Sequence, residues 1–277
     1  MIPPVASRFV AGESPAAALE HAREQNARGI GVICNLLGEH YDRRAPADDD
    51  TETYCRLLES IADADLGACL SPKPTQLGLD VSEAVFRENL ARLVETADDC
   101  GGFVWLDMEG PETVDATLDA YEHHAGREGC VGVAIQANMK RTGEDLHRLA
   151  GLPGKVRLVK GAYDPPAAIA YQEKRRVDQA YRDHLEYMFE HFDDGVAVGS
   201  HDPAMIELAA DLHDDVGTPY EVQMLMGVRE DAQRRLAADR EVWQYVPFGE
   251  RWLSYFYRRL AEGRENLTFA LRALWPF

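Results

Sequence analysis

Eight short apolar runs recur along this sequence, and each is followed by a segment with the apolar spacing of an amphipathic helix. The runs are almost continuously apolar, as expected of strands whose two faces are both covered. We predict strands over residues 29–37, 66–73, 103–109, 131–138, 156–163, 195–201, 220–226 and 242–248. Helices are predicted over residues 50–64, 82–99, 111–124, 143–150, 167–191, 203–214, 229–237 and 251–262.

Eight strand-helix units in about 250 residues indicate an α/β fold. They favour a closed, distorted (β/α)8 TIM-type barrel over an open doubly wound sheet. With 277 residues, of which 45% are hydrophobic, the chain can bury one large core. We therefore expect a single domain over residues 1–277. Residues 1–28 would lead in with a helix, the last predicted helix would lie over the active site, and residues 263–277 would form a tail.

The charge balance excludes some classes of partner. A formal net charge of -19 opposes binding to nucleic acid and to anionic lipid. Only five of the 29 basic residues are Lys, and acidic doublets recur, for example at Asp98 and Asp99. Such a surface is typical of a soluble acidic enzyme, and it also suits a protein that works in concentrated salt, where screening removes self-repulsion.

The cysteines and the apolar runs indicate a cytoplasmic protein. The five cysteines are scattered without CxxC spacing, which argues against a disulfide framework and a structural zinc site, so we expect no metal. No basic segment followed by an apolar stretch opens the chain, and no run approaches the ~18 apolar residues that span a bilayer.

Polar side chains collect where the predicted strands end. In a (β/α)8 barrel the chemistry lies at the carboxyl ends of the strands, because the βα loops converge there. Any one of these residues could be a helix cap or a satisfied core group, but six strand ends of this kind together indicate an active site. They include Lys73, Asp107, Gln136, Arg157, Lys160, Ser200, His201 and Gln223, and Met108 stands beside Asp107.

The last predicted helix carries a stripe suited to a small amino acid. Tyr255, Arg258, Arg259 and Glu262 stand at i, i+3, i+4 and i+7, on one helical face. Two guanidinium groups can hold a carboxylate bidentately, and the carboxylate of Glu262 can attract an ammonium group. Taken alone, Arg259 and Glu262 could equally be a solvated surface pair.

Together these residues resemble the flavin-dependent proline dehydrogenases of the monofunctional kind, whose catalytic domain is a distorted (β/α)8 barrel that binds FAD. The matching motifs occur in family order through nearly the whole chain. They are Lys73-x-Thr75-Gln76-Leu77-Gly78, Asp107-Met108-Glu109, Ile135-Gln136-Ala137, Arg157 to Tyr163, Ser200-His201, Gln223 to Arg229 and Tyr255-x-x-Arg258-Arg259-x-x-Glu262.

The resemblance implies oxidation of L-proline to Δ1-pyrroline-5-carboxylate, with hydride transfer from the ring carbon beside nitrogen to the flavin N5. By similarity, Arg258 and Arg259 clamp the proline carboxylate, and Lys73 adds a third cationic contact. The resemblance also makes Tyr245 and Tyr255 walls around the ring, and Glu262 an ion-pair partner that supports the arginines.

The resemblance also assigns a catalytic pair. Asp107 would pair with Lys73 or Arg259 and hold the cationic cluster in register, and a role as proton acceptor from the substrate amine is the alternative. Arg157 would lie near the flavin N5, where a fixed cation stabilises the reduced cofactor.

Further contacts with FAD follow from the same similarity. Gln136 would bond the edge of the flavin ring, and Met108 would border it. The backbone from Lys160 through Gly161 to Ala162 would approach closely, because Gly161 has no side chain. Ser200 and His201 would hold the pyrophosphate or ribitol side near a helix start at Pro203.

The resemblance also suggests partners. Electrons would leave to a quinone or another acceptor, which requires at most peripheral contact with the inner face of the cell membrane. Residues 267–277 could make that contact or could pack on the barrel. The second step of proline breakdown would need a separate pyrroline-5-carboxylate dehydrogenase. Asp202 stands where the family commonly has Asn, and the helices ahead of the barrel in many members are nearly absent.

Three other interpretations remain open at this stage. Lys160 could form the Schiff base of a class I aldolase barrel. The chain could be a non-catalytic amino-acid sensor that keeps Lys73 and the arginine pair, although Arg157 and Gln136 would then have no purpose. A related flavin barrel that acts on folates is less suited to the stripe on the last helix.

Overall fold

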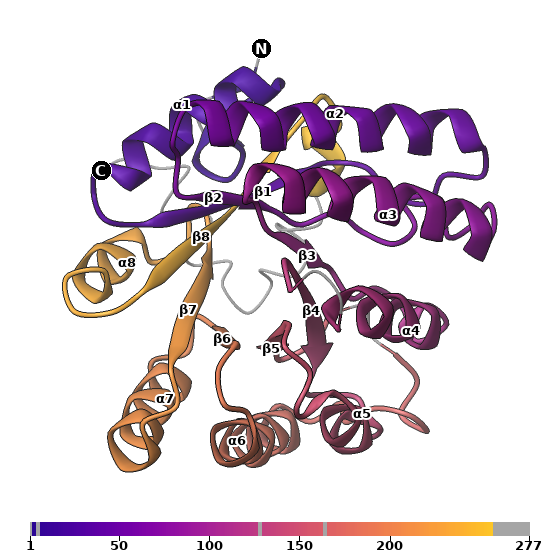
Figure 1. Cartoon of the computed structure of the whole chain (residues 1–277). Coiled ribbons are helices and arrows are strands. Elements are labelled where there is room, and N and C mark those ends of the chain that lie inside the picture. Colours follow the sequence, from indigo (N-terminus) through magenta and orange to yellow (C-terminus); the bar gives the residue numbers. More distant parts are fainter. Residues whose placement is uncertain (1, 4–5, 127–128, 163–164, 257–277) are drawn as a thin grey trace.

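The strands of the computed structural model close into a barrel. The structure describes residues 2–3, 6–126, 129–162 and 165–256. Eight parallel strands pair in chain order, and β8 returns to β1 (Figure 1). Their bounds are β1 Gly31–Leu36, β2 Ala68–Leu70, β3 Val104–Leu106, β4 Val131–Gln136, β5 Lys155–Val159, β6 Val196–Gly199, β7 Tyr220–Leu225 and β8 Val242–Phe248. The predicted TIM-type barrel is therefore confirmed.

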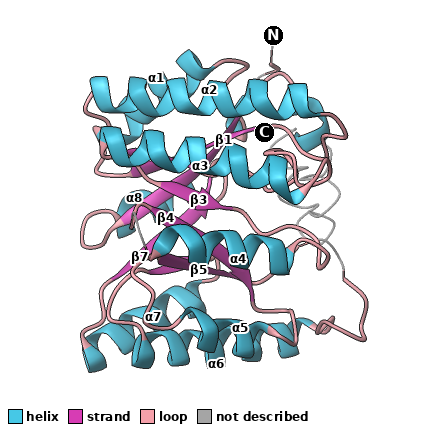
Figure 2. Cartoon of the chain, turned by 45° about the vertical axis from the view of Figure 1, so that its right-hand side comes forward, coloured by secondary structure: helices cyan, strands magenta, loops and turns pink. Residues whose placement is uncertain are grey.

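Helices form a ring around the strands, as Figure 2 shows from the side. A short 3-10 helix (η1, Ala6–Arg8) precedes them. Their bounds are α1 Pro15–Asn26, α2 Arg44–Asp63, α3 Glu83–Cys100, α4 Val114–Ala125, α5 Thr142–Leu149, α6 Lys174–His191, α7 Pro203–Val216 and α8 Glu230–Leu236. None of the helices within the described ranges is long and apolar enough to cross a bilayer.

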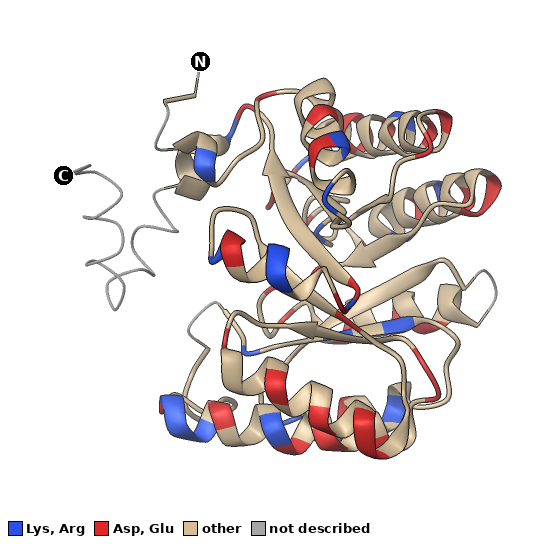
Figure 3. Ribbon diagram, turned by 90° about the vertical axis from the view of Figure 1, so that its left-hand side faces the viewer, with Lys and Arg blue, Asp and Glu red and all other residues tan. Residues whose placement is uncertain are grey.

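Alternation along each strand divides the core into two layers. On β1, Val32 and Cys34 face outward and pack with side chains of α1 and α2. Ile33, between them, faces the barrel interior, where it packs with Cys69, Trp105 and Ala197. Because successive strand residues point to opposite faces, one apolar run supplies both layers. Charged residues lie along the outer helices in Figure 3.

The predicted boundaries of two helices were wrong. α2 begins at Arg44 instead of residue 50, and Pro46 falls in its first turn, where no backbone N–H is needed. α6 begins at Lys174 instead of residue 167. The preceding residues pair with the turn after β4: Lys140 N donates to Ile169 O over 2.9 Å, and Tyr171 N donates to Asn138 O over 2.8 Å.

The predicted strands were also too long at most of their carboxyl ends. Pairing in β2 and β3 covers three residues each, and the polar residues that follow rise into loops above the barrel. The predicted last helix starts within the described residues, at 252–256, and the rest of it lies outside them.

Candidate active site

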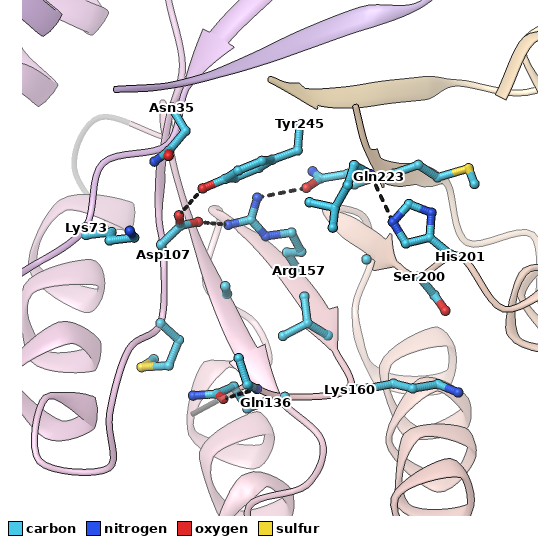
Figure 4. Close-up of a pocket in the computed structure, with 18 of the residues that line it drawn as sticks. Asn35, Lys73, Asp107, Gln136, Arg157, Lys160, Ser200, His201, Gln223 and Tyr245 are labelled. Carbon is cyan, nitrogen blue, oxygen red and sulfur yellow. Dashed lines mark hydrogen bonds and ion pairs between the residues drawn. The ribbon is translucent and has the colours of Figure 1, made fainter. Parts of the chain in front are cut away.

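A cavity of about 490 Å³ opens at the carboxyl end of the barrel (Figure 4). This size is typical of a pocket for a small molecule or part of a cofactor. Its lining comes from most of the strands and includes nearly every site residue predicted from the sequence that the structure describes. These residues are Lys73, Asp107, Met108, Gln136, Arg157, Lys160, Gly161, Ala162, Ser200, His201, Tyr245 and Tyr255.

Arg157 occupies the centre of the cavity floor. It lies on β5, is 4% exposed, and pairs with the carboxylate of Asp107. Its Nη1 donates to Gln223 Oε1 over 3.0 Å, and its Nη2 also donates to Ser71 Oγ over 3.2 Å. The guanidinium carbon lies 5.0 Å from the ring centre of Trp105. A buried charge needs this many partners to offset its lost hydration, and they fix its position.

Asp107 accepts hydrogen bonds from three sides. Besides Arg157, Ser71 Oγ donates to it over 2.7 Å and the Tyr245 hydroxyl donates over 2.5 Å. Burial, followed by the charge of Asp107, raises the pKa of Tyr245 well above its usual value. The phenol therefore remains a neutral donor to the carboxylate.

The expected pairing of Asp107 with Lys73 was wrong. Lys73 instead contacts Glu39, with Nζ 2.7 Å from Oε2. Asp107 follows the inward-facing Trp105 by two residues, so it points into the barrel, where Arg157 reaches it. Lys73 lies in the loop after β2 and faces the loop after β1. The alternative partner, Arg259, lies outside the described residues.

The loop that carries Lys73 is held by Glu109, which the sequence analysis left without a role. Glu109 is 1% exposed; its Oε2 accepts from Thr75 N over 2.9 Å, and its Oε1 accepts from Thr75 Oγ1 over 2.8 Å. Burial raises the pKa of Glu109. Thr75 Oγ1 in turn accepts from His40 N over 3.0 Å, so the loops after β1, β2 and β3 are joined.

One wall of the cavity combines a tethered amide with a close backbone approach. Gln136 accepts from Ala162 N over 3.0 Å and donates to Glu109 O over 2.8 Å. Gly161 has a φ of +121°, and a Cβ there would lie 2.2 Å from Asn138 Oδ1. Among the described residues, Asn138 Oδ1 is buried without a hydrogen-bond partner. This combination fits a flat, hydrogen-bonding group such as a flavin ring held against the 160–162 backbone.

The side chain of Lys160 turns toward the outer helices. Its Nζ lies 2.5 Å from Asp178 Oδ1 on α6 and 2.7 Å from Asp202 Oδ2, the N-cap of α7. The hydrogen bond from Lys160 lowers the pKa of Asp202. Two carboxylates engage this amine and direct it away from the cavity, which disfavours the Schiff-base interpretation.

Ser200 and His201 line the other wall beside the start of α7. Asp202 N donates to Ser200 Oγ over 3.1 Å, and Leu225 N donates to His201 Nε2 over 3.1 Å. Their side chains are thus fixed by neighbouring backbone groups, as a binding surface requires.

Several predicted residues belong to the last helix. Tyr255 lines the cavity and packs against Val10 and Leu37. Arg258, Arg259 and Glu262 lie outside the described residues, as do residues 263–277. Asn35, Glu39 and Ser71 also hold or line the site, and they were not predicted from the sequence. Their positions at or just beyond the carboxyl ends of β1 and β2 were the available signal.

The fold and this cavity define the class of the protein as a (β/α)8-barrel enzyme whose active site lies at the carboxyl ends of the strands. A family profile described as proline dehydrogenase matches residues 18–272. The chain belongs to the proline dehydrogenase family, and the predicted activity and flavin dependence are confirmed at that level.

Relatives of similar length support this membership. A proline dehydrogenase of Deinococcus radiodurans is 34% identical over 284 residues, which cover 98% of this chain and 90% of the relative. Proline dehydrogenases 2 and 1 of Bacillus subtilis are 31% and 32% identical over 275 residues, which cover 97% of this chain and 90% of each relative.

Solved structures of proline utilization A share the fold. The protein from Bdellovibrio bacteriovorus, inactivated by N-propargylglycine, matches with a TM-score of 0.85 and 24% identity over 94% of this chain. The protein from Corynebacterium freiburgense matches with a TM-score of 0.78 and 23% identity over 97% of this chain. This chain spans about a third of their length, since it covers 32% of each.

Proposed function

We propose that this chain oxidises L-proline to Δ1-pyrroline-5-carboxylate with FAD as its cofactor. The observation that carries the proposal is the buried Arg157 on the cavity floor, held by Asp107, Ser71 and Gln223. When bound, FAD would supply the hydride acceptor. A fixed guanidinium beside that acceptor favours the negative charge that arrives with the hydride.

The remaining residues divide the work of binding. Lys73 and the arginines at 258 and 259 would hold the proline carboxylate, and Tyr245 and Tyr255 would enclose the ring. Anchoring one end of a rigid ring places its reacting carbon, so catalysis comes mainly from orientation. Gln136, Met108 and the 160–162 backbone would hold the flavin ring, and Ser200 with His201 would hold its phosphate or ribitol side.

Asp107 acts in this proposal as a positioning residue. It already accepts from Arg157, Ser71 and Tyr245, which leaves it poorly placed to take a proton from the substrate. Glu262 would support the arginine pair through an ion pair.

We further propose a single-domain protein over residues 1–277, located in the cytoplasm, that passes electrons to a quinone at the membrane surface. A separate dehydrogenase would oxidise the product. The relatives named proline dehydrogenase support the proposed barrel domain, because the similarity extends over 97–98% of this chain and 90% of each relative.

The first test is the visible spectrum of protein purified in high salt with FAD, before and after anaerobic addition of L-proline. Bleaching of the oxidised flavin band is the expected result, and a short-chain ubiquinone should restore the band. A flavin band that ignores proline would overturn the substrate assignment. A protein that binds no flavin but is inactivated by borohydride with a carbonyl substrate would support the aldolase alternative.

A further inference from the structure

A buried carboxylate below the active site has no role in the proposed reaction. Glu221 lies on β7 at the amino end of the barrel interior and is 4% exposed. Its Oε2 lies 2.6 Å from Lys155 Nζ, and its Oε1 accepts from Gln223 Nε2 over 2.6 Å. Gln223 in turn accepts from Arg157 Nη1 over 3.0 Å. A continuous chain of contacts therefore joins the amino end of the barrel to the cavity floor.

The residue pattern along the strands builds this chain. Lys155 and Arg157 are two apart on β5, and Glu221 and Gln223 are two apart on β7, so each pair points into the barrel. Strand β6 lies between them, with Ala197 in register with both Arg157 and Glu221. Its methyl side chain is small enough for the longer side chains to meet across β6.

The orientation of the Gln223 amide follows from its neighbours. Arg157 can only donate, and an ionised Glu221 can only accept. One orientation satisfies both, with the amide nitrogen on Glu221 and the amide oxygen on Arg157. Burial lowers the pKa of Lys155, but the interaction with Glu221 more than offsets it, so the net shift is upward and Lys155 remains an ammonium group at neutral pH.

We propose that Glu221 is a positioning residue for Arg157. It fixes the Gln223 amide so that its oxygen holds Nη1, while Asp107 and Ser71 hold Nη2. Both ends of the guanidinium are then restrained, and its plane is set toward the cavity. This inference rests on the proposed function, in which Arg157 tunes the bound flavin.

The decisive variant is Glu221→Gln, which keeps the shape of the side chain. One orientation of the new amide would place its NH2 group against the Lys155 ammonium. The other would place it against the Gln223 NH2 group, which would then turn its own NH2 group toward Arg157. Either way two donors meet. The clash with the charged ammonium is the costlier one, so the second orientation is expected, and in it the restraint on Arg157 weakens.

The measurement is the midpoint potential of the bound flavin, determined by dye equilibration without proline, together with the rate of flavin reduction by proline. The expected result for Glu221→Gln is a lower potential and a reduction rate about tenfold slower, with the KM for proline changed less than twofold. Glu241→Gln is the matched control, since Glu241 is exposed and its carboxylate accepts from Trp243 Nε1 at the same end of the barrel.

A double-mutant cycle separates positioning from a general loss of packing. If Glu221 acts through Gln223, then Gln223→Leu should lower the potential by at least as much, and adding Glu221→Gln should change it little further. Additive effects, or a Glu221→Gln protein that behaves like Glu241→Gln, would overturn the proposal. If Glu221→Gln fails to fold, Gln223→Leu tests the proposal by itself, and an unchanged flavin potential in that variant would overturn the proposal. Because the potential is read without proline, failure of the substrate assignment remains a separate result.

Discussion

The two ends of the barrel interior are filled in different ways. At the amino end, aromatic rings lie over glycines on neighbouring strands: Trp243 covers Gly31 and Trp105 covers Gly132, with a Cβ at either glycine 2.5 Å from the ring. Toward the carboxyl end, the next inward-facing positions carry Asp107, Arg157 and Tyr245, which surround an open cavity. The comparison shows that the same strands provide close packing at the amino end of the barrel and active-site residues at its carboxyl end.

The largest expected effect comes from Arg157→Met, which removes the charge from the cavity floor. We expect flavin reduction by proline to slow by about a thousandfold. Asp107 would lose its cationic partner, with a loss of about 3 kcal/mol in the free energy of unfolding. Stopped-flow reduction and chemical denaturation measure the two effects.

Lys155→Met, two residues earlier on β5, is the matched control for this change. It removes a cation from the amino end but leaves the Glu221 to Gln223 bond intact, so the reduction rate should remain within about threefold. Equal kinetic losses in the two variants would contradict the division between the ends.

A second change tests the amino end by packing alone. Gly31→Ala places a Cβ 2.5 Å from the Trp243 ring, so the ring must move, at about 1–3 kcal/mol of unfolding free energy. The KM for proline and the flavin potential should not change, because Trp243 does not line the cavity. Gly143→Ala on α5, where the nearest atom is 3.7 Å away, serves as the neutral control.

A third change loosens one loop of the carboxyl end. Glu109→Gln keeps one acceptor for Thr75 and loses the other, which weakens the hold on the loop of Lys73 by about 1 kcal/mol. The KM for proline should rise about fivefold with a smaller change in kcat. Glu112→Gln, an exposed neighbour, should leave both constants unchanged. A fall in kcat without a rise in KM would argue against this role of Glu109.

The smallest expected effect concerns Lys160 and pH. Lys160 lowers the pKa of Asp202, and the net shift of Asp178 is also downward despite its burial. A carboxyl group with a lowered pKa stabilises the fold above its unfolded value, near 4, and loses this contribution as pH falls through the folded pKa. Lys160→Met should therefore reduce the free energy of unfolding by about 0.5–1 kcal/mol at pH 7.

The difference between Lys160→Met and the parent protein should begin to shrink as pH falls below about 4, because the unfolded chain then takes up protons that the folded parent still excludes, and it should vanish below the lowered pKa values of the two carboxyl groups. Urea denaturation at pH 7 and near pH 3.5 measures it. A difference that is constant across this range would contradict the role of the ion pairs.

Much of the fold could be read from the sequence because its signals are local. Apolar runs separated by helical periodicity predicted all eight strands, and the C-terminal run at residues 242–248 matched β8 at both ends. Where the predicted boundary of an element was wrong, a contact between residues distant in sequence had set the boundary. The pairing of residues 169–171 with the turn after β4 kept this segment out of α6, although its composition favours a helix.

The site followed the same rule. Its residues stand at strand ends, so their common location was predictable from the barrel alone, and the ordered motifs predicted the family. Their partners were not. Whether Asp107 contacts Lys73 or Arg157 depends on the direction of its side chain at the point where β3 ends and the loop begins. Lys73 pairs instead with Glu39, in the loop after the neighbouring strand β1.

The sequence by itself determined the barrel, the family and the set of polar residues at its carboxyl end, because periodicity and motif order are properties of the chain. The tertiary structure alone decided that Arg157 is the buried centre of the site, that Lys160 belongs to the outer helices, and that Glu221 and Gln223 connect the two ends of the barrel. Each depends on contacts between elements distant in sequence, such as Arg157 with Asp107 and Lys155 with Glu221, and only the folded barrel brings these side chains within hydrogen-bonding distance.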